Sequence, residues 1–340
     1  MHITNKVGIY ILSILHLLVD GLCAYTVFNK LYLYDSFIIT TIVFILYNIL
    51  AFSLQPFVGL LIDKYHHEKV LLNISLIILI LASIVNLPWF IITIMLGVSN
   101  SIFHVVGGIY TVKYNIHKMT YLGLFVALGA TGLALGTNIS NFIMFVIMLI
   151  LTFILGFIIN FIKLEININK NLRPIKKENV KYLLLLSIVV LIRAIMGSAC
   201  KPSVEVTLIE LISISIGISL GKIFGGILSD KIGIKYTTII TLTMSLIGYF
   251  FFRNNLVIYI ISTILFNTTM PITLYLSNNL LEDHYGLSFG TLAFMLYPGY
   301  LLGSLYTMLN LSIYPLICIS IILSMIVILY VNNKQGVIND

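Results

Sequence analysis

Long runs of apolar residues recur along the chain from Val7 to Tyr330, with few charges between them. A bilayer-spanning helix needs about 20 predominantly apolar residues, and these runs lack the ten-residue alternation of membrane-spanning strands. The pattern therefore predicts an all-α polytopic membrane protein. Cutting the runs where charges, Pro, Asn and Gly interrupt them gives twelve expected spans, at residues 7–28, 36–62, 69–87, 89–112, 119–138, 141–162, 181–200, 204–228, 236–252, 256–280, 286–309 and 311–331.

The composition supports a membrane protein, since 60% of the 340 residues are hydrophobic and 9% are charged. Soluble domains carry about 25% charged residues, which excludes that class. The net charge of +7 does not indicate a nucleic-acid partner, because the basic residues fall in short loops between spans. Three scattered cysteines without CxxC spacing predict neither a disulfide framework nor a zinc site. The apolar stretch at the start carries His16 and Asp20, so we expect a retained first span and not a signal peptide.

One long polar connection, residues 163–180, falls at the midpoint of the chain. It predicts a cytoplasmic linker between an N-terminal six-helix half, 1–162, and a C-terminal half, 181–340. Cytoplasmic loops accumulate Lys and Arg. If both termini are cytoplasmic, the opposite side receives only Lys30, Lys201 and Arg253 of the 19 basic residues, with Arg193 and Lys222 inside spans. We therefore expect a multi-pass protein of the cell membrane with both termini in the cytoplasm.

A short motif occurs twice, at the end of the second span of each half. The first copy has Gly59, Asp63 and Lys64, and the second has Gly226, Asp230 and Lys231 with the same G-x-x-x-D-K spacing. A six-residue motif with three fixed residues is weak evidence when it occurs once. The same motif at equivalent places in the two halves indicates an internal repeat.

The second copy continues through Gly233 to Lys235, and the whole stretch resembles the loop motif Gly-x-x-x-Asp-Arg/Lys-x-Gly-x-Arg/Lys of the major facilitator superfamily. The resemblance covers nearly the whole chain through its six-plus-six layout. It implies a central cavity lined by spans 1, 4, 7 and 10, and a gating role for the motif aspartates at helix N-termini. Residues 65–69 of the first copy lack the second glycine and the following basic residue, so the resemblance implies this role more directly for Asp230. The stretches 100–108 and 270–274 are also similar to a bacterial branch near the fosmidomycin-resistance-like exporters.

Polar residues inside the spans follow the same layout. Apart from Lys69 at the very start of span 3, spans 3, 6, 9 and 12 contain no charged residue and no His, as expected of lipid-facing helices. Ionisable groups inside a membrane mark transport pathways by default. The candidate substrate and proton pathway comprises His16, Asp20, Asn100, His104, Arg193, Asn267 and, more weakly, Glu210 near the outer end of span 8.

Each ionisable candidate has a structural alternative. Asp20 is either a proton or cation site or a structural carboxylate paired to a neighbouring helix. Arg193 either binds an anionic group of the substrate or pairs with a carboxylate such as Asp20. His104 either relays protons or packs through a hydrogen bond. His16 and Asp20 stand one helical turn apart, as two metal ligands can, but nothing in the sequence completes a coordination sphere, so no metal site is predicted.

The sequence has neither an HExxH motif nor a P-loop. We therefore expect neither an enzyme nor a cofactor. The expected function is secondary active transport of a small organic solute, anionic or zwitterionic, by a proton-coupled monomer working through alternating access. Two alternatives remain open: a membrane sensor or scaffold that no longer transports, and a cation or metal transporter using His16, Asp20, His104 and Glu210.

Overall fold

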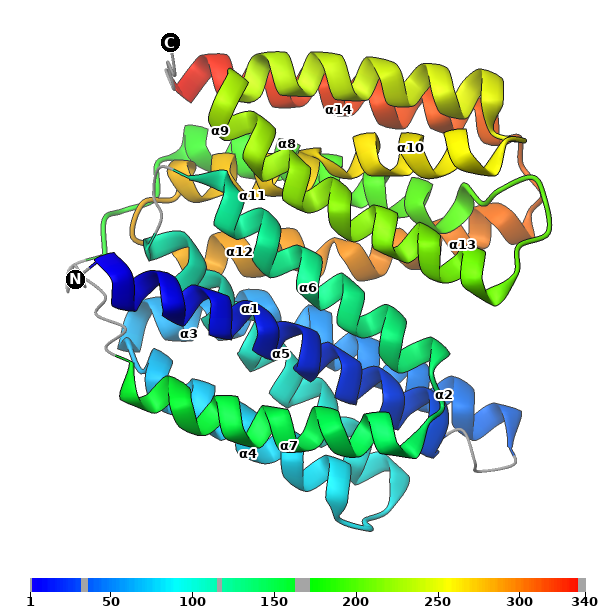
Figure 1. Ribbon diagram of the computed structural model, residues 1–340. Coiled ribbons are helices and arrows are strands. Elements are labelled where there is room, and N and C mark those ends of the chain that lie inside the picture. Colours follow the sequence, from blue (N-terminus) through cyan, green and yellow to red (C-terminus); the bar gives the residue numbers. More distant parts are fainter. Residues whose placement is uncertain (1, 32–35, 115–117, 163–171, 336–340) are drawn as a thin grey trace. The chain divides into compact units, whose positions relative to one another are not determined.

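The computed structural model describes residues 2–31, 36–114, 118–162 and 172–335, and helices make up nearly all of them (Figure 1). The described part of the chain contains no strand. Residues 163–171 of the expected linker lie outside the described residues. The helices belong to two compact units.

The first unit comprises residues 1–116, 128–172 and 284–290. α1 packs against α5 and α7, and α4 also packs against α5 (Figure 1). In the apolar stretches of α1 and α5, 67% and 61% of the residues are buried, against 22% in the apolar stretch of α7. The interior of this unit is therefore built from α1 and α5. The elements are α1 (His2–Tyr25), η1 (Thr26–Lys30), α2 (Phe37–Asn48), η3 (Ile49–Ser53), α3 (Gln55–Tyr65), α4 (Glu68–Ile84), α5 (Trp89–Tyr114), α7 (Phe142–Ile158) and η4 (Ile159–Phe161).

The second unit comprises residues 117–127, 173–283 and 291–340. In it α9 packs along α10 and α14, and α8 packs against α13 and α14 (Figure 1). α6 (Met119–Asn138) and α12 (Tyr285–Phe294) are each divided between the two units. The other elements are α8 (Lys177–Ala199), α9 (Leu208–Phe252), α10 (Leu256–Asn267), α11 (Thr269–Leu280), α13 (Leu296–Met308) and α14 (Ile313–Gln335).

The helices follow the expected spans, with breaks at particular residues. Nine helices in the described part of the chain are long and apolar enough to cross a membrane. Expected spans 8 and 9 run together as α9, with a single non-helical residue, Gly233, at φ 81° and ψ 160°. α4 is short, at 17 residues, and α12 and α13 are separate short helices. These three differences account for nine long helices where the sequence predicts twelve spans.

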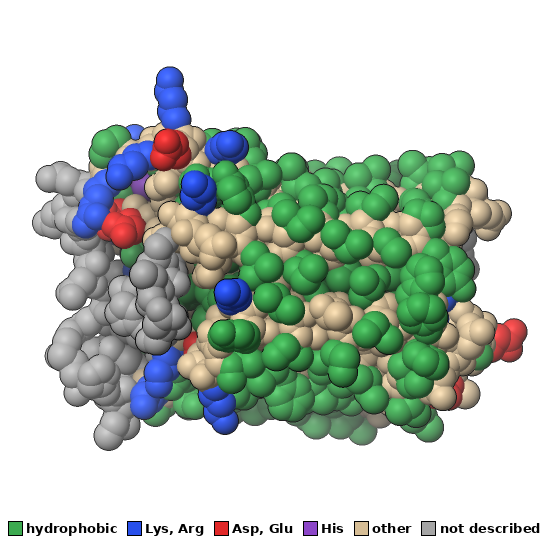
Figure 2. Space-filling view, turned by 90° about the horizontal axis from the view of Figure 1, so that it is seen from above, with side chains coloured by type: hydrophobic (Ala, Val, Ile, Leu, Met, Phe, Trp, Pro, Cys, Tyr) green, Lys and Arg blue, Asp and Glu red, His purple; other side chains and the backbone are tan. Residues whose placement is uncertain are grey.

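The surface is apolar over most of one face. Figure 2 shows hydrophobic side chains across the middle of this face, while most of its Lys, Arg, Asp and Glu side chains gather toward one end. On α7, Phe153 and Phe157 are each more than half exposed. Such exposure is stable against lipid hydrocarbon and costly against water. The chain is accordingly a multi-pass membrane protein.

Candidate functional site

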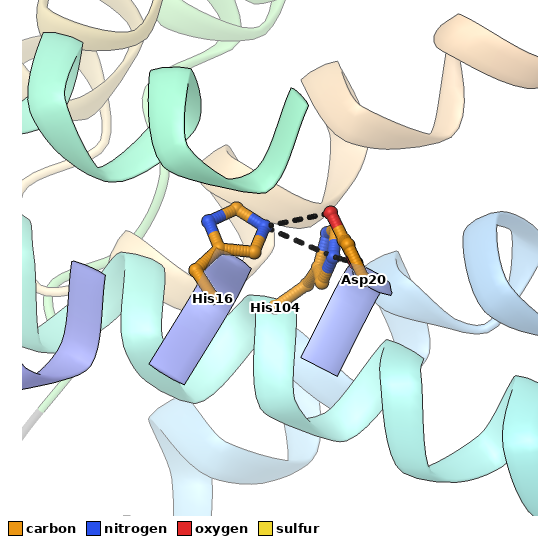
Figure 3. A group of neighbouring side chains, drawn as sticks. All are labelled: His16, Asp20 and His104. Atoms are coloured by element: carbon orange, nitrogen blue, oxygen red, sulfur yellow. Dashed lines mark hydrogen bonds and ion pairs between the residues drawn. The ribbon is translucent and has the colours of Figure 1, made fainter. Parts of the chain in front are cut away.

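Three ionisable side chains meet inside the first unit, two from α1 and one from α5 (Figure 3). His104 Nε2 lies 2.8 Å from Asp20 Oδ1 and 3.1 Å from His16 Nε2. His16 Nε2 lies 3.3 Å from Asp20 Oδ2. All three side chains are at most 13% exposed. One carboxylate and two imidazoles therefore share a small, nearly dry space.

Helix geometry explains why these residues meet. His16 and Asp20 are one turn apart on α1, and Asn100 and His104 are one turn apart on α5, so each pair lies on one face of its helix. Asn100 donates from Nδ2 to Asp20 Oδ1 at 2.8 Å. A Cβ on Gly129 of α6 would stand 2.3 Å from His16 Nε2, so glycine is needed there to admit the ring. The site is thus shaped by three helices of the first unit.

The hydrogen bonds to the Asp20 carboxylate determine what this cluster can bind. Asp20 accepts hydrogen bonds from Asn100 and from the His104 ring, and it faces His16 as well. Burying a charge is tolerated only when it is paired and hydrogen-bonded, which these three neighbours achieve. The group can hold a proton, and it also offers three atoms within 4.8 Å of one another that suit a metal ion. His104 is the third such group, which helix spacing within α1 alone does not reveal.

Arg193 occupies a different environment, in the second unit. Its side chain on α8 is buried, at 6% exposure. Nη1 donates to Thr269 Oγ1 at 3.3 Å, and Nη2 lies 2.6 Å from the Sδ of Met270, both at the start of α11. Among the described residues of this unit, no carboxylate lies within 4.0 Å of its nitrogens. A buried guanidinium with neutral neighbours retains the capacity to bind an anion.

Two other pathway candidates have local roles in the structure. Asn267 donates from Nδ2 to the Thr263 carbonyl of its own helix at 2.9 Å. Glu210 forms a capping box at the start of α9, where Oε2 accepts from Thr207 N at 2.7 Å and Thr207 Oγ1 accepts from Glu210 N at 3.4 Å. These contacts satisfy free N–H groups at the helix start and explain Glu210 without a role in transport.

The two motif aspartates each bind the N-terminus of a helix in their own unit. Asp63 accepts from Gly286 N and Leu287 N, both at 2.8 Å, at the start of α12. Asp230 accepts from Met119 N at 2.7 Å and Thr120 N at 2.9 Å, at the start of α6. A carboxylate at this position satisfies free N–H groups and interacts favourably with the helix dipole.

The remaining motif residues support these contacts. A Cβ on Gly59 would stand 2.2 Å from the Gly286 carbonyl oxygen, and one on Gly226 would stand 2.5 Å from that of Met119. The glycines therefore let the helix starts approach. The motif lysines point to the surface: Lys64 and Lys235 lie over the rings of Tyr65 and Tyr236, at 5.0 Å and 5.9 Å, and Lys231 is exposed.

Sequence reasoning missed a buried ion pair beside the first motif. Glu68 is 4% exposed and its Oε1 lies 3.4 Å from the Nζ of Lys113, at the end of α5. Glu68 occupies the motif position that Lys235 has in the second copy. This change from a positive to a negative side chain was the sign in the sequence that the first copy has a different ionic partner. Burial also lowers the pKa of His66, just before this pair, below its ordinary value.

The chain is similar to known proteins in its three-dimensional structure. No family model and no curated protein sequence matches the chain. Among solved structures it is similar to the E. coli fucose:proton symporter FucP, with a TM-score of 0.71, 12% identity, and coverage of 98% of this chain and 99% of the other. A structure of the major facilitator superfamily transporter FucP in the outward conformation gives a TM-score of 0.72 and 13% identity over the same shares.

Neither similarity supports the closer resemblance to fosmidomycin-resistance-like exporters. At this level of identity the comparison establishes architecture, while substrates are set by individual sites. Nearly the whole of both chains is superimposed, and the two motif copies lie at helix ends in equivalent places. The chain has the fold of the major facilitator superfamily transporters.

Proposed function

We propose that this protein is a secondary active transporter of a small organic anion or zwitterion, working by alternating access and coupled to protons. The observation that carries the substrate class is Arg193, which is buried and contacts only neutral groups within its unit. Its planar fork matches a carboxylate or phosphate, and binding such a group offsets the cost of an unpaired buried charge. The fold supports transport, and one structural neighbour is named as a proton symporter.

Coupling to protons rests on the Asp20 cluster. A carboxylate with two imidazoles at 2.8 and 3.3 Å can take up and release a proton without leaving any group unsatisfied. Asp20 lies within the expected first span, where an ionisable group serves by default as part of a pathway. We place both termini in the cytoplasm, the protein in the cell membrane, and the functional unit as a monomer.

The test is a thermal-shift screen of the purified, detergent-solubilised protein against small carboxylates, organic phosphates, amino acids, neutral sugars and amines. A ligand that binds the native state raises its apparent stability. We expect stabilisation by one or more anionic or zwitterionic compounds. Arg193→Gln should abolish that shift, and Arg193→Lys should weaken it because the bidentate fork is lost.

Arg253 provides a matched control, since it follows α9 and its guanidinium lies 5.6 Å from the Tyr314 ring centroid. Arg253→Gln should leave the ligand shift unchanged. Stabilisation by amines alone, or an undiminished anion shift in Arg193→Gln, would refute the proposed substrate class. Uptake of the identified compound into proteoliposomes then distinguishes a transporter from a sensor that only binds.

A further inference from the structure

We infer that His16, Asp20 and His104 form a binding site for one divalent transition-metal ion of the Zn²⁺ class. This site is independent of the organic solute and of Arg193. The sequence presents only two of the ligands, on α1, and the fold adds the third from α5. Figure 3 shows the two imidazole rings and the carboxylate directed at a common point.

The distances between the three groups fit a tetrahedral ion. Zinc binds His nitrogen and carboxylate oxygen at about 2.0–2.2 Å, so adjacent ligand atoms in a tetrahedron are ~3.3 Å apart. The two Nε2 atoms are 3.1 Å apart, and each faces a different oxygen of Asp20, with His16 Nε2 3.3 Å from Oδ2 and His104 Nε2 2.8 Å from Oδ1. These separations are close to the tetrahedral value, and the carboxylate can offer either oxygen to the ion.

The two imidazoles and the carboxylate direct lone pairs toward one another. The two Nε2 atoms face each other at 3.1 Å while both also face Asp20. One proton on either Nε2 satisfies these groups, and when that proton leaves, lone pairs of both imidazoles and of the carboxylate converge. A single cation in the proton's place satisfies all of them together.

The ligand types select the kind of ion. Two neutral imidazoles and one carboxylate suit zinc, cobalt, nickel, copper or ferrous iron, whereas Mg²⁺ and Ca²⁺ favour shells of oxygen. The one carboxylate neutralises half of the ion's double charge, and the neutral imidazoles supply the remaining ligands, where the three side chains are at most 13% exposed. The first-row transition metals are therefore the matching class.

The surroundings hold the ligands in place. Asn100 Nδ2 donates to Asp20 Oδ1 and also lies 3.7 Å from the Sγ of Cys23. This hydrogen bond holds the carboxylate through Oδ1, while His16 faces Oδ2. The ring of His16 rests against Gly129 and lies 5.9 Å from the Phe103 ring. Outer partners of this kind orient metal ligands, and losing one typically weakens affinity by about 10–100-fold.

Equilibrium dialysis of the full-length protein against buffered ZnCl₂ tests the site. The protein should be purified through an affinity tag without histidines, in a Cys200→Ser/Cys318→Ser background that removes thiols distant in sequence from α1. We expect one Zn²⁺ per chain, and a Co²⁺ derivative with the intense visible absorption of four-coordinate cobalt. His16→Gln, Asp20→Asn and His104→Gln should each abolish this binding, and Asn100→Ala should weaken it by about 10–100-fold.

His67 supplies the matched control, because it is exposed on the loop after α3 and belongs to no cluster of metal-ligating groups among the described residues. His67→Gln should retain one Zn²⁺. Gly129→Ala keeps all three ligands but displaces the His16 ring. We expect weaker Zn²⁺ binding in this variant while it still elutes as a folded monomeric peak. That result attributes the loss to the geometry of the site and not to unfolding. Equal Zn²⁺ content in the wild type and the three ligand variants, or an octahedral cobalt spectrum, would overturn the inference. Neither outcome bears on the anion screen, which tests Arg193, so the metal site and the substrate class fail separately; a bound Zn²⁺ and the coupling proton would compete for Asp20.

Discussion

The Asp20 carboxylate of α1 lies 2.8 Å from His104 Nε2 of α5, and this contact joins two of the most buried helices through one charge. Asn100 Nδ2 reaches the same oxygen from one turn away on α5. A change in what Asp20 holds therefore alters the interaction between α1 and α5 directly. This arrangement is expected if binding of a proton or an ion to Asp20 shifts the equilibrium between two positions of these helices.

Asp20→Asn is predicted to uncouple transport from the proton gradient. Asparagine is nearly isosteric, so packing is retained, but it cannot carry the charge that a proton neutralises. Concentrative uptake of the ligand into proteoliposomes under an imposed pH gradient should be lost. Exchange of labelled for unlabelled ligand at equal pH should remain measurable.

The control for this prediction is Asn267→Ala, because within the described part of the chain the Asn267 side chain hydrogen-bonds to its own helix, to the Thr263 carbonyl at 2.9 Å. It should keep both uptake and exchange. Concentrative uptake at the wild-type level by Asp20→Asn would show that the coupling proton is carried by another group.

Asp63→Asn is predicted to loosen its helix contact more than Asp230→Asn. Both carboxylates bind two backbone N–H groups, but Asp63 is 2% exposed and Asp230 is exposed. A carboxylate at a helix N-terminus contributes about 0.3–1 kcal/mol at the surface and up to ~2 kcal/mol when partly buried. Burial thus reverses the order that the intact second motif alone would suggest.

The measurement is the rate at which maleimide labels Cys23, which is fully buried on α1, in a Cys200→Ser/Cys318→Ser background. If the motif aspartates hold a closed state, labelling should accelerate in the order wild type, Asp230→Asn, Asp63→Asn. Identical rates in all three proteins would contradict a gating role.

The sequence predicts most of the architecture because lipid imposes long apolar helices, and charges inside them stand out. The i, i+4 spacing of His16 and Asp20 shows that they share a face, and membrane cost marks Arg193. The sequence does not show that His104 completes the cluster, since this depends on how α1 packs on α5. Nor does it show that Glu68 pairs with Lys113, because that contact joins helices whose register is set by tertiary packing.

Topology yields a further prediction, motivated by the few basic residues on one side. Single cysteines at Lys176 and Lys334, in a Cys-free background, should react with impermeant maleimide only after cells are opened, because Lys and Arg mark cytoplasmic segments. Lys176 precedes α8 and Lys334 lies in the last turn of α14. A cysteine at Lys201, after α8, should react in intact cells and serves as the control. Labelling of either cytoplasmic position in intact cells would contradict the proposed orientation.

Gly233 and His66 occupy the same position of the two motif copies, and both have positive φ, but their substitution is predicted to have unequal effects. Gly233 has φ 81° and ψ 160°, a region that is essentially open to glycine alone, and straining another residue there costs about 1–3 kcal/mol. His66 has φ 55° and ψ 44°, in the left-handed region that other residues can enter. This difference explains how the first copy functions as a helix end without its glycine.

Gly233→Ala should therefore lower the thermal unfolding midpoint of the purified protein clearly, because the turn that separates the two halves of α9 is strained. His66→Gly should change the free energy of unfolding by less than about 1 kcal/mol, since relief of the left-handed conformation is offset by greater freedom of the unfolded chain. Differential scanning fluorimetry in detergent measures both. Gly197→Ala in α8 is the control, because its Cβ meets no atom within 4 Å and alanine favours the helix, so its midpoint should be unchanged or raised. A Gly233→Ala midpoint equal to that of Gly197→Ala would mean that the chain passes this turn in a conformation open to ordinary residues.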